Sequence, residues 1–568
     1  MHRFPRLSAP QAHLAVSLSL ACLVALGCKG MEKAAVAGPA DIGGTLVITT
    51  PADAGTLLPP LIERITDRQV SDLIYDRLAD IGDNLNSIGD KGFKPQLAER
   101  WEWAPDSLSI AFHLNPHAKW HDGVPVRASD VRYSVSLIKD PALGSLAAPL
   151  ITNIDSAAVR DSLTAVVYFK RHTPEQFYDF VYQVAVLPEH VLGNTPAAKL
   201  KESEVGRRGI GSGRFRLAKW EPGAKIELVA DTANYRGRAK LDRVIFSIAP
   251  DFNGAVTRFF AGDADLFENI RPEHLSRFTG DTTRRMLRYP TLQYTDFLMN
   301  LKDPKAPGMP HPVFGDRAVR RALTMATDRR AMLKNAFDTV GQPLYGPFPH
   351  TSPVADTTLP QILYDTTRAK ALLDSAGWTA GPDGIRVKNG HRLEFAISVP
   401  NSSASRKQYA TLLQEAFRRV GASATIDLSD YPTYMSKLST HAFDAQLGNY
   451  APDPGVSNFK QTWSTSGIGK DGSNYGSYSN AYVDAVLDSA TATFDPARTK
   501  GYARRAFETI IEDAPAIWLY EPPTVMGISK RVHTTPLRAD GYWSGMADWW
   551  IPAGERTARD RIGLRPTP

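Results

Sequence analysis

The chain has 568 residues, 43% of them hydrophobic, so it can bury large cores and is long enough for more than one domain. Its formal charge is only +6, and no block of five or more basic residues occurs, which argues against a nucleic-acid-binding protein. The only two cysteines are Cys22 and Cys28, which excludes a zinc site built on thiolates and leaves a mature chain that begins at Cys28 without a disulfide.

The beginning of the chain has the pattern of a secretory signal. Two arginines and no acid precede an apolar run at 14–26. This run is shorter than the roughly 20 residues that a membrane-spanning helix needs. Ala25–Cys28 is similar to a bacterial lipobox, in which Cys28 would carry the lipid and become the mature N-terminus; cleavage by ordinary signal peptidase, with Cys28 incidental, is the alternative. We expect a signal peptide at 1–27 and a lipid-anchored tether of small residues at 28–43.

Hydrophobic periodicity predicts the first elements of the folded part. A β-branched strand is expected at 44–50 and a helix at 70–78, where apolar residues fall on one face. Two short strands follow at 99–103 and 109–114, in which bulky side chains alternate with polar or smaller ones. A turn then leads to a helix that starts near Asp130, because acids and hydroxyls suit the first turn of a helix.

The most specific string in the chain spans Pro95 to Ser134. Its characteristic residues are Trp101, Phe112, Leu114, the Lys119-Trp120-His121-Asp122-Gly123 turn, Pro125, Ala128, Asp130-Val131 and Ser134. The string resembles the signature of the bacterial extracellular solute-binding proteins of family 5, which are the oligopeptide- and dipeptide-binding receptors of ABC importers. Arg127 stands where the family usually has a capping Thr, and we expect Ser129 to take the capping role.

Further blocks extend this resemblance along the chain. Gly211–Gly223 is similar to the family's glycine turn and following strand, with Arg214 in the place of the usual proline. Pro312–Arg330 is predicted as one helix and is similar to a helix of the family. Strands are also predicted at 215–219, 225–229, 244–248, 294–301, 424–428, 443–447 and 514–520, with a helix at 406–420.

Strands that alternate with helices at this spacing predict an α/β protein. The resemblance covers about 44–532 and implies a two-lobe, periplasmic-binding-protein-like fold (type II, class C) with the ligand cleft between the lobes. We expect the first lobe at 44–290, with an extra subdomain inserted at about 79–196. The second lobe is expected at 291–519, and 520–568 would return to the first lobe and end in a C-terminal tail.

An enzyme is the alternative reading of the chain. His113, His117 and His121 have the spacing of metal ligands on a helix, but Pro116 and the strand pattern before it break that helix. No nucleophile elbow and no phosphate-binding loop occurs in the sequence. We therefore expect no catalysis, no metal site and no cofactor.

The resemblance also implies where a ligand would bind. Receptors of this family close their lobes around the ligand, and an Asp in a W-x-x-D segment binds the ammonium group of a peptide. The corresponding segment here is Gly448–Pro454, in which Tyr450 replaces the aromatic residue and Asp453 is the candidate anchor. An ungapped count from Gly448 shifts this Asp by one position, so an Asp that only shapes an Asp-Pro turn is the alternative. Trp463 would either line the cleft or belong to the core.

The expected protein is a monomeric lipoprotein in the periplasmic space, tethered to the membrane by its lipid. It would capture peptides and deliver them to the permease and ATPase subunits of an ABC importer, without a nucleic-acid partner. Nickel chelates, haem, glutathione and oligosaccharides are other ligands that the family serves. A peptide chemoreceptor or a chaperone-like component is the alternative outside transport.

Overall fold

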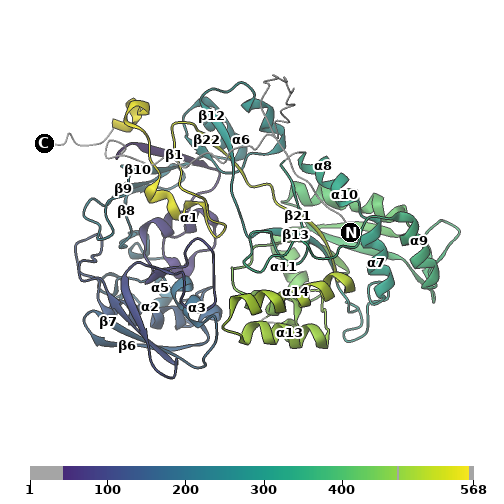
Figure 1. Ribbon diagram of the computed structural model, residues 1–568. Helices are drawn as coiled ribbons and strands as arrows, with labels where there is room; N and C mark the ends of the chain where they lie inside the picture. Colours follow the sequence, from purple (N-terminus) through teal and green to yellow (C-terminus); the bar gives the residue numbers. More distant parts are fainter. Residues whose placement is uncertain (1–41, 339, 470–471, 562–568) are drawn as a thin grey trace, which may run out of the picture. The chain divides into compact units, whose positions relative to one another are not determined.

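The computed structural model describes residues 42–338, 340–469 and 472–561 (Figure 1). The predicted signal peptide, the lipidation of Cys28 and nearly all of the tether lie outside these residues and stay predictions. Within the described ranges, no helix combines the length and the apolar composition that crossing a membrane requires.

A seven-stranded sheet holds the first and last parts of the described chain. Its strands are, in spatial order, β12 (Arg284–Arg288), β22 (Val525–Ser529), β11 (Leu266–Phe267), β1 (Thr45–Thr50), β10 (Arg243–Ile248), β9 (Lys225–Ala230) and β8 (Phe215–Glu221). β1 runs parallel to β10 and β11, and the remaining pairs are antiparallel. Helices α1 (Ile65–Ile74) and α6 (Phe252–Ala261) contact this sheet. We call the part built on this sheet the first lobe.

An antiparallel four-stranded sheet is inserted into the first lobe. Its strands are, in spatial order, β4 (Ala98–Trp103), β5 (Ser109–Leu114), β7 (Thr164–Phe169) and β6 (Ile154–Asp161). Around it lie α2 (Ala128–Lys139), α3 (Gln176–Gln183) and the small sheet of β2 (Ala79–Asp80) and β3 (Lys94–Pro95). The short helices α4 (Glu189–Leu192) and α5 (Ala197–Leu200) follow α3. Phe112, Trp120, Phe177 and Phe180 belong to a hydrophobic core of its own.

A six-stranded sheet forms the second lobe. Its strands are, in spatial order, β14 (Gln342–Pro343), β21 (Ala516–Glu521), β13 (Tyr294–Met299), β20 (Ala445–Tyr450), β18 (Glu394–Pro400) and β19 (Ser423–Ser429). Every residue of β13 and β21 is buried, as expected for strands covered on both faces. Its helices are α7 (Arg317–Ala326), α8 (Arg329–Phe337), α9 (Thr366–Ser375), α10 (Ala404–Arg418), α11 (Tyr431–Ser439), α12 (Ser457–Trp463), α13 (Ala481–Ala492) and α14 (Pro496–Asp513). The lobe also contains a small antiparallel three-stranded sheet of β15 (Thr379–Ala380), β16 (Arg386–Lys388) and β17 (His391–Arg392).

The chain passes between the two sheets in two segments. One segment, 289–293, joins β12 to β13, and the other, 522–524, joins β21 to β22. The two crossing segments are bonded to each other, because Tyr289 N donates to Thr524 O at 3.1 Å and the Thr524 hydroxyl donates to Tyr289 O. The exact lobe boundaries that the sequence suggested near 290 and 519 remain proposals.

The two strongest sequence strings meet at His121. Its Nδ1 accepts a hydrogen bond of 3.1 Å from Gly211 N, and its Nε2 lies 2.9 Å from Gly213 O. A Cβ on Gly211 would lie 2.1 Å from the carbonyl oxygen of Ile74, at the end of α1, so only glycine fits there. The strings therefore build the junction between the inserted sheet and the first lobe.

Several predicted helix ends are wrong for local reasons. The helix expected at 70–78 is α1, which begins five residues earlier and ends at Ile74, because the chain turns extended at Tyr75. Pro312–Arg330 contains two helices, α7 and α8, since Thr327 is extended and Asp328 caps the second helix through Ala331 N.

The predicted cap of α2 also differs. The helix starts at Ala128, so Ser129 is not its capping residue. Instead Asp130, in the first turn, accepts a hydrogen bond of 2.8 Å from Arg127 N, and it also accepts one of 3.2 Å from the Trp120 indole.

Candidate ligand-binding cleft

A cavity of about 360 Å³ lies where segments of both lobes meet. The first lobe contributes the start of α1, the end of α3 and the segment 539–543, and the second lobe contributes 451–453. A second cavity of about 430 Å³ shares four residues with the first and reaches the start of α10. The shared residues, Asn269, Gln293, Pro522 and Pro523, lie in or next to the crossing segments. We call the two cavities together the cleft.

Asp453 reaches the cleft from the second lobe. It follows β20 closely, and the prolines on either side of it restrict the backbone of the loop. Its Oδ2 accepts a hydrogen bond of 2.9 Å from Nε2 of Gln183, at the end of α3. Among the described residues, no lysine or arginine lies within ion-pair distance of Asp453. The carboxylate is half-buried in the cleft wall and is therefore available to a cationic group of a ligand.

Arg68 and Asp540 bring opposite charges to the same cavity from the first lobe. Arg68 donates to the Tyr182 hydroxyl at 2.9 Å, and its Nε lies 3.5 Å from Asp72. Asp540 is paired at both carboxylate oxygens with Arg538, at 3.0 and 2.7 Å. Asp540 is thus already paired, whereas Asp453 interacts with Arg68 only beyond ion-pair distance.

Glu268 is the fourth charged residue that lines this cavity. Burial raises the pKa of its carboxyl group above the ordinary value, although hydrogen bonds from Tyr542 and Gln69 oppose the rise. A carboxyl group with a raised pKa is less able to stay ionised near neutral pH.

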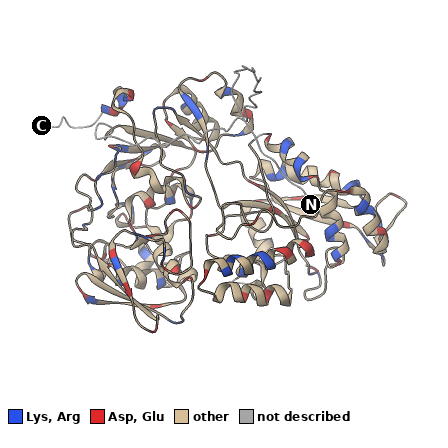
Figure 2. Cartoon of the chain, viewed as in Figure 1, with Lys and Arg blue, Asp and Glu red and all other residues tan. Residues whose placement is uncertain are grey.

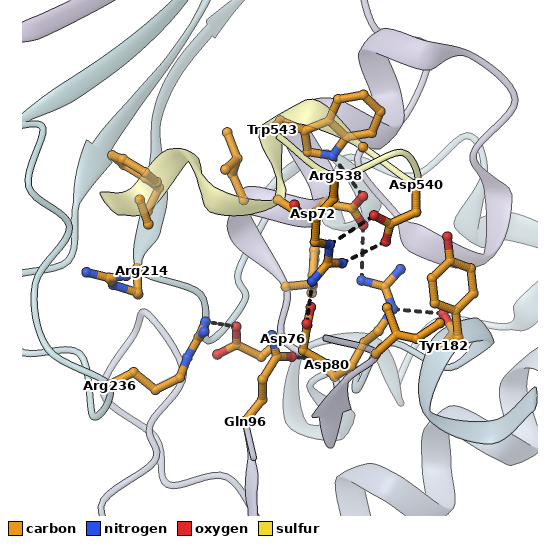
Figure 3. A pocket seen from close by; sticks show the side chains of 18 of the residues that line it. Asp72, Asp76, Asp80, Gln96, Tyr182, Arg214, Arg236, Arg538, Asp540 and Trp543 are labelled. Carbon is orange, nitrogen blue, oxygen red and sulfur yellow. Dashed lines mark hydrogen bonds and ion pairs between the residues drawn. The ribbon is translucent and has the colours of Figure 1, made fainter. Parts of the chain in front are cut away.

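A third, smaller cavity of about 130 Å³ lies in the first lobe (Figure 3). It shares five residues with the cleft: Arg68, Tyr182, Asp540, Gly541 and Trp543. Its charged lining residues are Arg68, Arg77, Arg214, Arg236, Arg538, Asp72, Asp76, Asp80, Asp540 and Asp548. The signs balance, and the side chains pair with one another: dashed lines in Figure 3 join Arg236 to Asp76 and Arg538 to Asp80 and Asp540. Arg214 pairs with Asp548 at 2.9 Å.

The pairs in this third cavity act on the pKa of its carboxyl groups to different degrees, and burial raises the pKa of Asp76 in spite of its pair with Arg236. Burial opposes ionisation of Asp72, but Arg77 and Arg68 hold its pKa below the ordinary value. The network therefore holds the C-terminal segment 538–548 against α1 and orients Arg68 and Asp540 at the cleft wall. Elsewhere both signs of charge are dispersed over helices and strands (Figure 2).

Tyr450 and Trp463 lie away from the cleft lining, unlike Asp453. The Tyr450 hydroxyl accepts a hydrogen bond of 2.7 Å from Gln446, and its ring stacks on Tyr294 with centroids 5.2 Å apart. Trp463 is 1% exposed and packs edge-on against Trp518 in the second-lobe core. Neither residue lines the two cavities, so their predicted ligand contacts receive no support from this geometry.

The residues that sequence reasoning missed are Arg68, Glu268 and Asp540. They come from a helix, a strand end and the C-terminal segment, which lie far apart in the sequence. None of them belongs to a short motif, so no sequence signal identifies them.

Two α/β lobes, joined by two crossing segments and lined with polar groups where they meet, define a two-lobed solute-binding protein. Residues 92–471 match the model of the bacterial extracellular solute-binding proteins, family 5 Middle, and the chain belongs to this family. The family consists of solute-binding proteins and not of enzymes.

Relatives with known names agree with this assignment. The oligopeptide-binding protein AppA of Bacillus subtilis (strain 168) is 27% identical over 534 residues, which cover 91% of this chain and 93% of that protein. The probable D,D-dipeptide-binding periplasmic protein DdpA of Escherichia coli (strain K12) is 26% identical over 505 residues, covering 86% of this chain and 90% of that protein.

Solved structures show the same two-lobe α/β fold. The structure of AppA from Bacillus subtilis in complex with a nonapeptide has a TM-score of 0.73 at 24% identity and covers 90% of this chain and 99% of that one. NikZ from Campylobacter jejuni in complex with Ni(L-His) has a TM-score of 0.72 at 23% identity, covering 89% of this chain and 99% of that one. The predicted type II periplasmic-binding-protein fold is confirmed.

Proposed function

We propose that this chain is the peptide-capturing component of an ABC importer, exported and held at the membrane by a lipid on Cys28. The named relatives that bind oligopeptides or dipeptides support a peptide ligand. Its partners would be the permease and ATPase subunits of the importer, and it would act as a monomer in the periplasmic space.

The observation that carries the peptide ligand is the half-buried carboxylate of Asp453, which lines the cleft and is bonded to Gln183 but to no lysine or arginine within ion-pair distance among the described residues. A peptide ammonium group is costly to bury without an anionic partner, and Asp453 offers one. The cleft is large enough for several residues of an extended chain, whose backbone groups can bond to side chains and to water.

Closure couples binding to delivery. A ligand that contacts both lobes binds the closed arrangement more tightly than the open one, and it shifts the population toward the closed form. The importer then meets a surface that depends on whether the cleft is filled.

Native mass spectrometry of the purified protein, followed by denaturing release, tests the proposed ligand. Copurifying short peptides are the expected result and would give their length directly. A single non-peptide mass, such as a metal chelate, would overturn the peptide ligand. The mass of the N-terminal fragment tests the anchor separately, because lipidated Cys28 differs in mass from an unmodified terminus.

A further inference from the structure

The two ends of α3, in the inserted subdomain, both contact one loop of the second lobe. At its C-terminal end Gln183 donates to Asp453, as described above. At its N-terminal end, Glu175 directly precedes the helix and bonds to the backbone just after the same loop. The helix has eight residues, so these contacts lie about 12 Å apart along it.

Both carboxylate oxygens of Glu175 are used in this contact. Oε1 accepts hydrogen bonds of 2.7 Å from Val456 N and of 2.7 Å from the Ser87 hydroxyl. Oε2 accepts a hydrogen bond of 3.1 Å from Ser457 N. Two of the three donors therefore belong to the second lobe, and the third belongs to the inserted subdomain.

Glu175 is a buried carboxylate without a cation beside it. It is 5% exposed, and no ion pair links it to a lysine or arginine in the described part of the chain. A buried carboxylate is unfavourable unless hydrogen bonds replace its water, and bonds to an ionised acceptor are the stronger kind. The three donors meet that requirement only while the second-lobe loop stays in place.

Gly455 shows that the two lobes fit closely here. A Cβ on Gly455 would lie 2.8 Å from Oε1 of Glu175, which is closer than real Cβ contacts allow. Gly455 is buried, and its backbone is outside the left-handed region, so a substitution by alanine tests the steric effect of a Cβ without backbone strain. Asp453 is only two residues away, on the same loop.

We propose that Glu175 is a positioning residue for the cleft: through Val456 and Ser457 it holds the Asp453 loop at the cavity wall and favours the approach of the two lobes. The contact is made by protein groups alone, so it biases closure before a ligand adds its own contacts. Because water can solvate the separated groups, the contact is reversible. The inference rests on the proposed function, in that Asp453 matters only if it contacts the ligand.

The test compares Glu175→Ala, Glu175→Gln and Gly455→Ala with the controls Glu99→Gln, at an exposed site, and Gly501→Ala, where a Cβ meets nothing within 4 Å. Hydrogen exchange reports on the amides of Val456 and Ser457, and small-angle scattering reports on the separation of the lobes.

We expect exchange at both amides to rise by about tenfold or more in Glu175→Ala, the factor that corresponds to losing a hydrogen bond to a charged group. Glu175→Gln keeps an acceptor oxygen and should show a smaller rise. Gly455→Ala should reproduce the effect from the other lobe, with a larger radius of gyration. In the double variant Glu175→Ala with Gly455→Ala, exchange at the two amides should be no faster than in the more affected single variant, since both substitutions disturb the same contact.

Unchanged exchange and scattering in Gly455→Ala and Glu175→Ala would overturn the proposal. If Glu175 only stabilised the start of α3, its variants would melt earlier, and Gly455→Ala would behave like Gly501→Ala. No peptide enters these measurements, so their failure would leave the proposed transport function standing. A non-peptide ligand in mass spectrometry would overturn the proposed peptide ligand and leave the contact of Glu175 standing.

Discussion

Replacing Asp453 by Asn is the most direct test of the binding mechanism. The substitution removes the charge but keeps the shape, and the amide oxygen can still accept the hydrogen bond from Gln183. Truncating one partner of a buried charge pair costs about 2 to 5 kcal/mol, whereas an exposed pair is worth about 0 to 1 kcal/mol. Because Asp453 is half-buried, we expect the lower end of the first range, about 2 kcal/mol, or a roughly 30-fold loss of affinity.

Isothermal titration with a copurified peptide and its N-acetylated form measures this loss. The acetylated peptide has no ammonium group, so its affinity should hardly change in Asp453→Asn. Asp488→Asn, on the exposed face of α13, is the matched control. An equal loss of affinity for both peptides would refute the role of Asp453 as the ammonium partner.

Three further predictions concern the folded chain. Asp296 is fully buried with no hydrogen-bond partner for either carboxyl oxygen among the described residues, and burial raises its pKa well above 3.8. The folded state therefore holds the proton more tightly than the unfolded state, so the stabilisation is complete at low pH and is lost as the pH rises. The melting temperature of Asp296→Asn should rise relative to that of the natural chain between about pH 4 and pH 8, and parallel pH profiles of the two melting temperatures would contradict this. Trp463→Phe should lower the free energy of unfolding in denaturant by about 1 to 2 kcal/mol and leave peptide affinity unchanged. A selective loss of affinity would instead show that Trp463 contacts the ligand. Gly211→Ala should cost about 3 kcal/mol or more because its Cβ would collide with the Ile74 carbonyl, while Gly554→Ala, with open space around it, should be nearly neutral; similar melting temperatures for the two would show that the junction is looser than described.

Periodicity predicts most strands of both lobes because their burial alternates or is complete. The strand expected at 225–229 is β9, in which buried and partly exposed residues alternate. Helix ends are less predictable. The break between α7 and α8 depends on Asp328 acting as a cap, and an aspartate can also occur inside a helix.

The candidate site was only partly predictable, for a physical reason. Asp453, which lines the cleft, can be nominated from the sequence because it lies in a local segment that resembles a family motif. Aromatic spacing cannot distinguish a cleft wall from a core, because both can contain aromatic side chains, and this ambiguity covers Tyr450 and Trp463. Arg68 and Glu268 reach the cleft only through the tertiary fold. The signature around His121, in contrast, identifies a scaffold junction and not a ligand contact.

The crossing segments carry three prolines, Pro290, Pro522 and Pro523, and all three line the cleft. A proline has a nearly fixed φ, so only a few backbone torsions in these segments are free to change when the segments bend. An open form with fewer accessible bends has less conformational entropy to lose when the lobes come together. The stiffness of the crossing segments therefore contributes to affinity, although it adds no contact to the ligand.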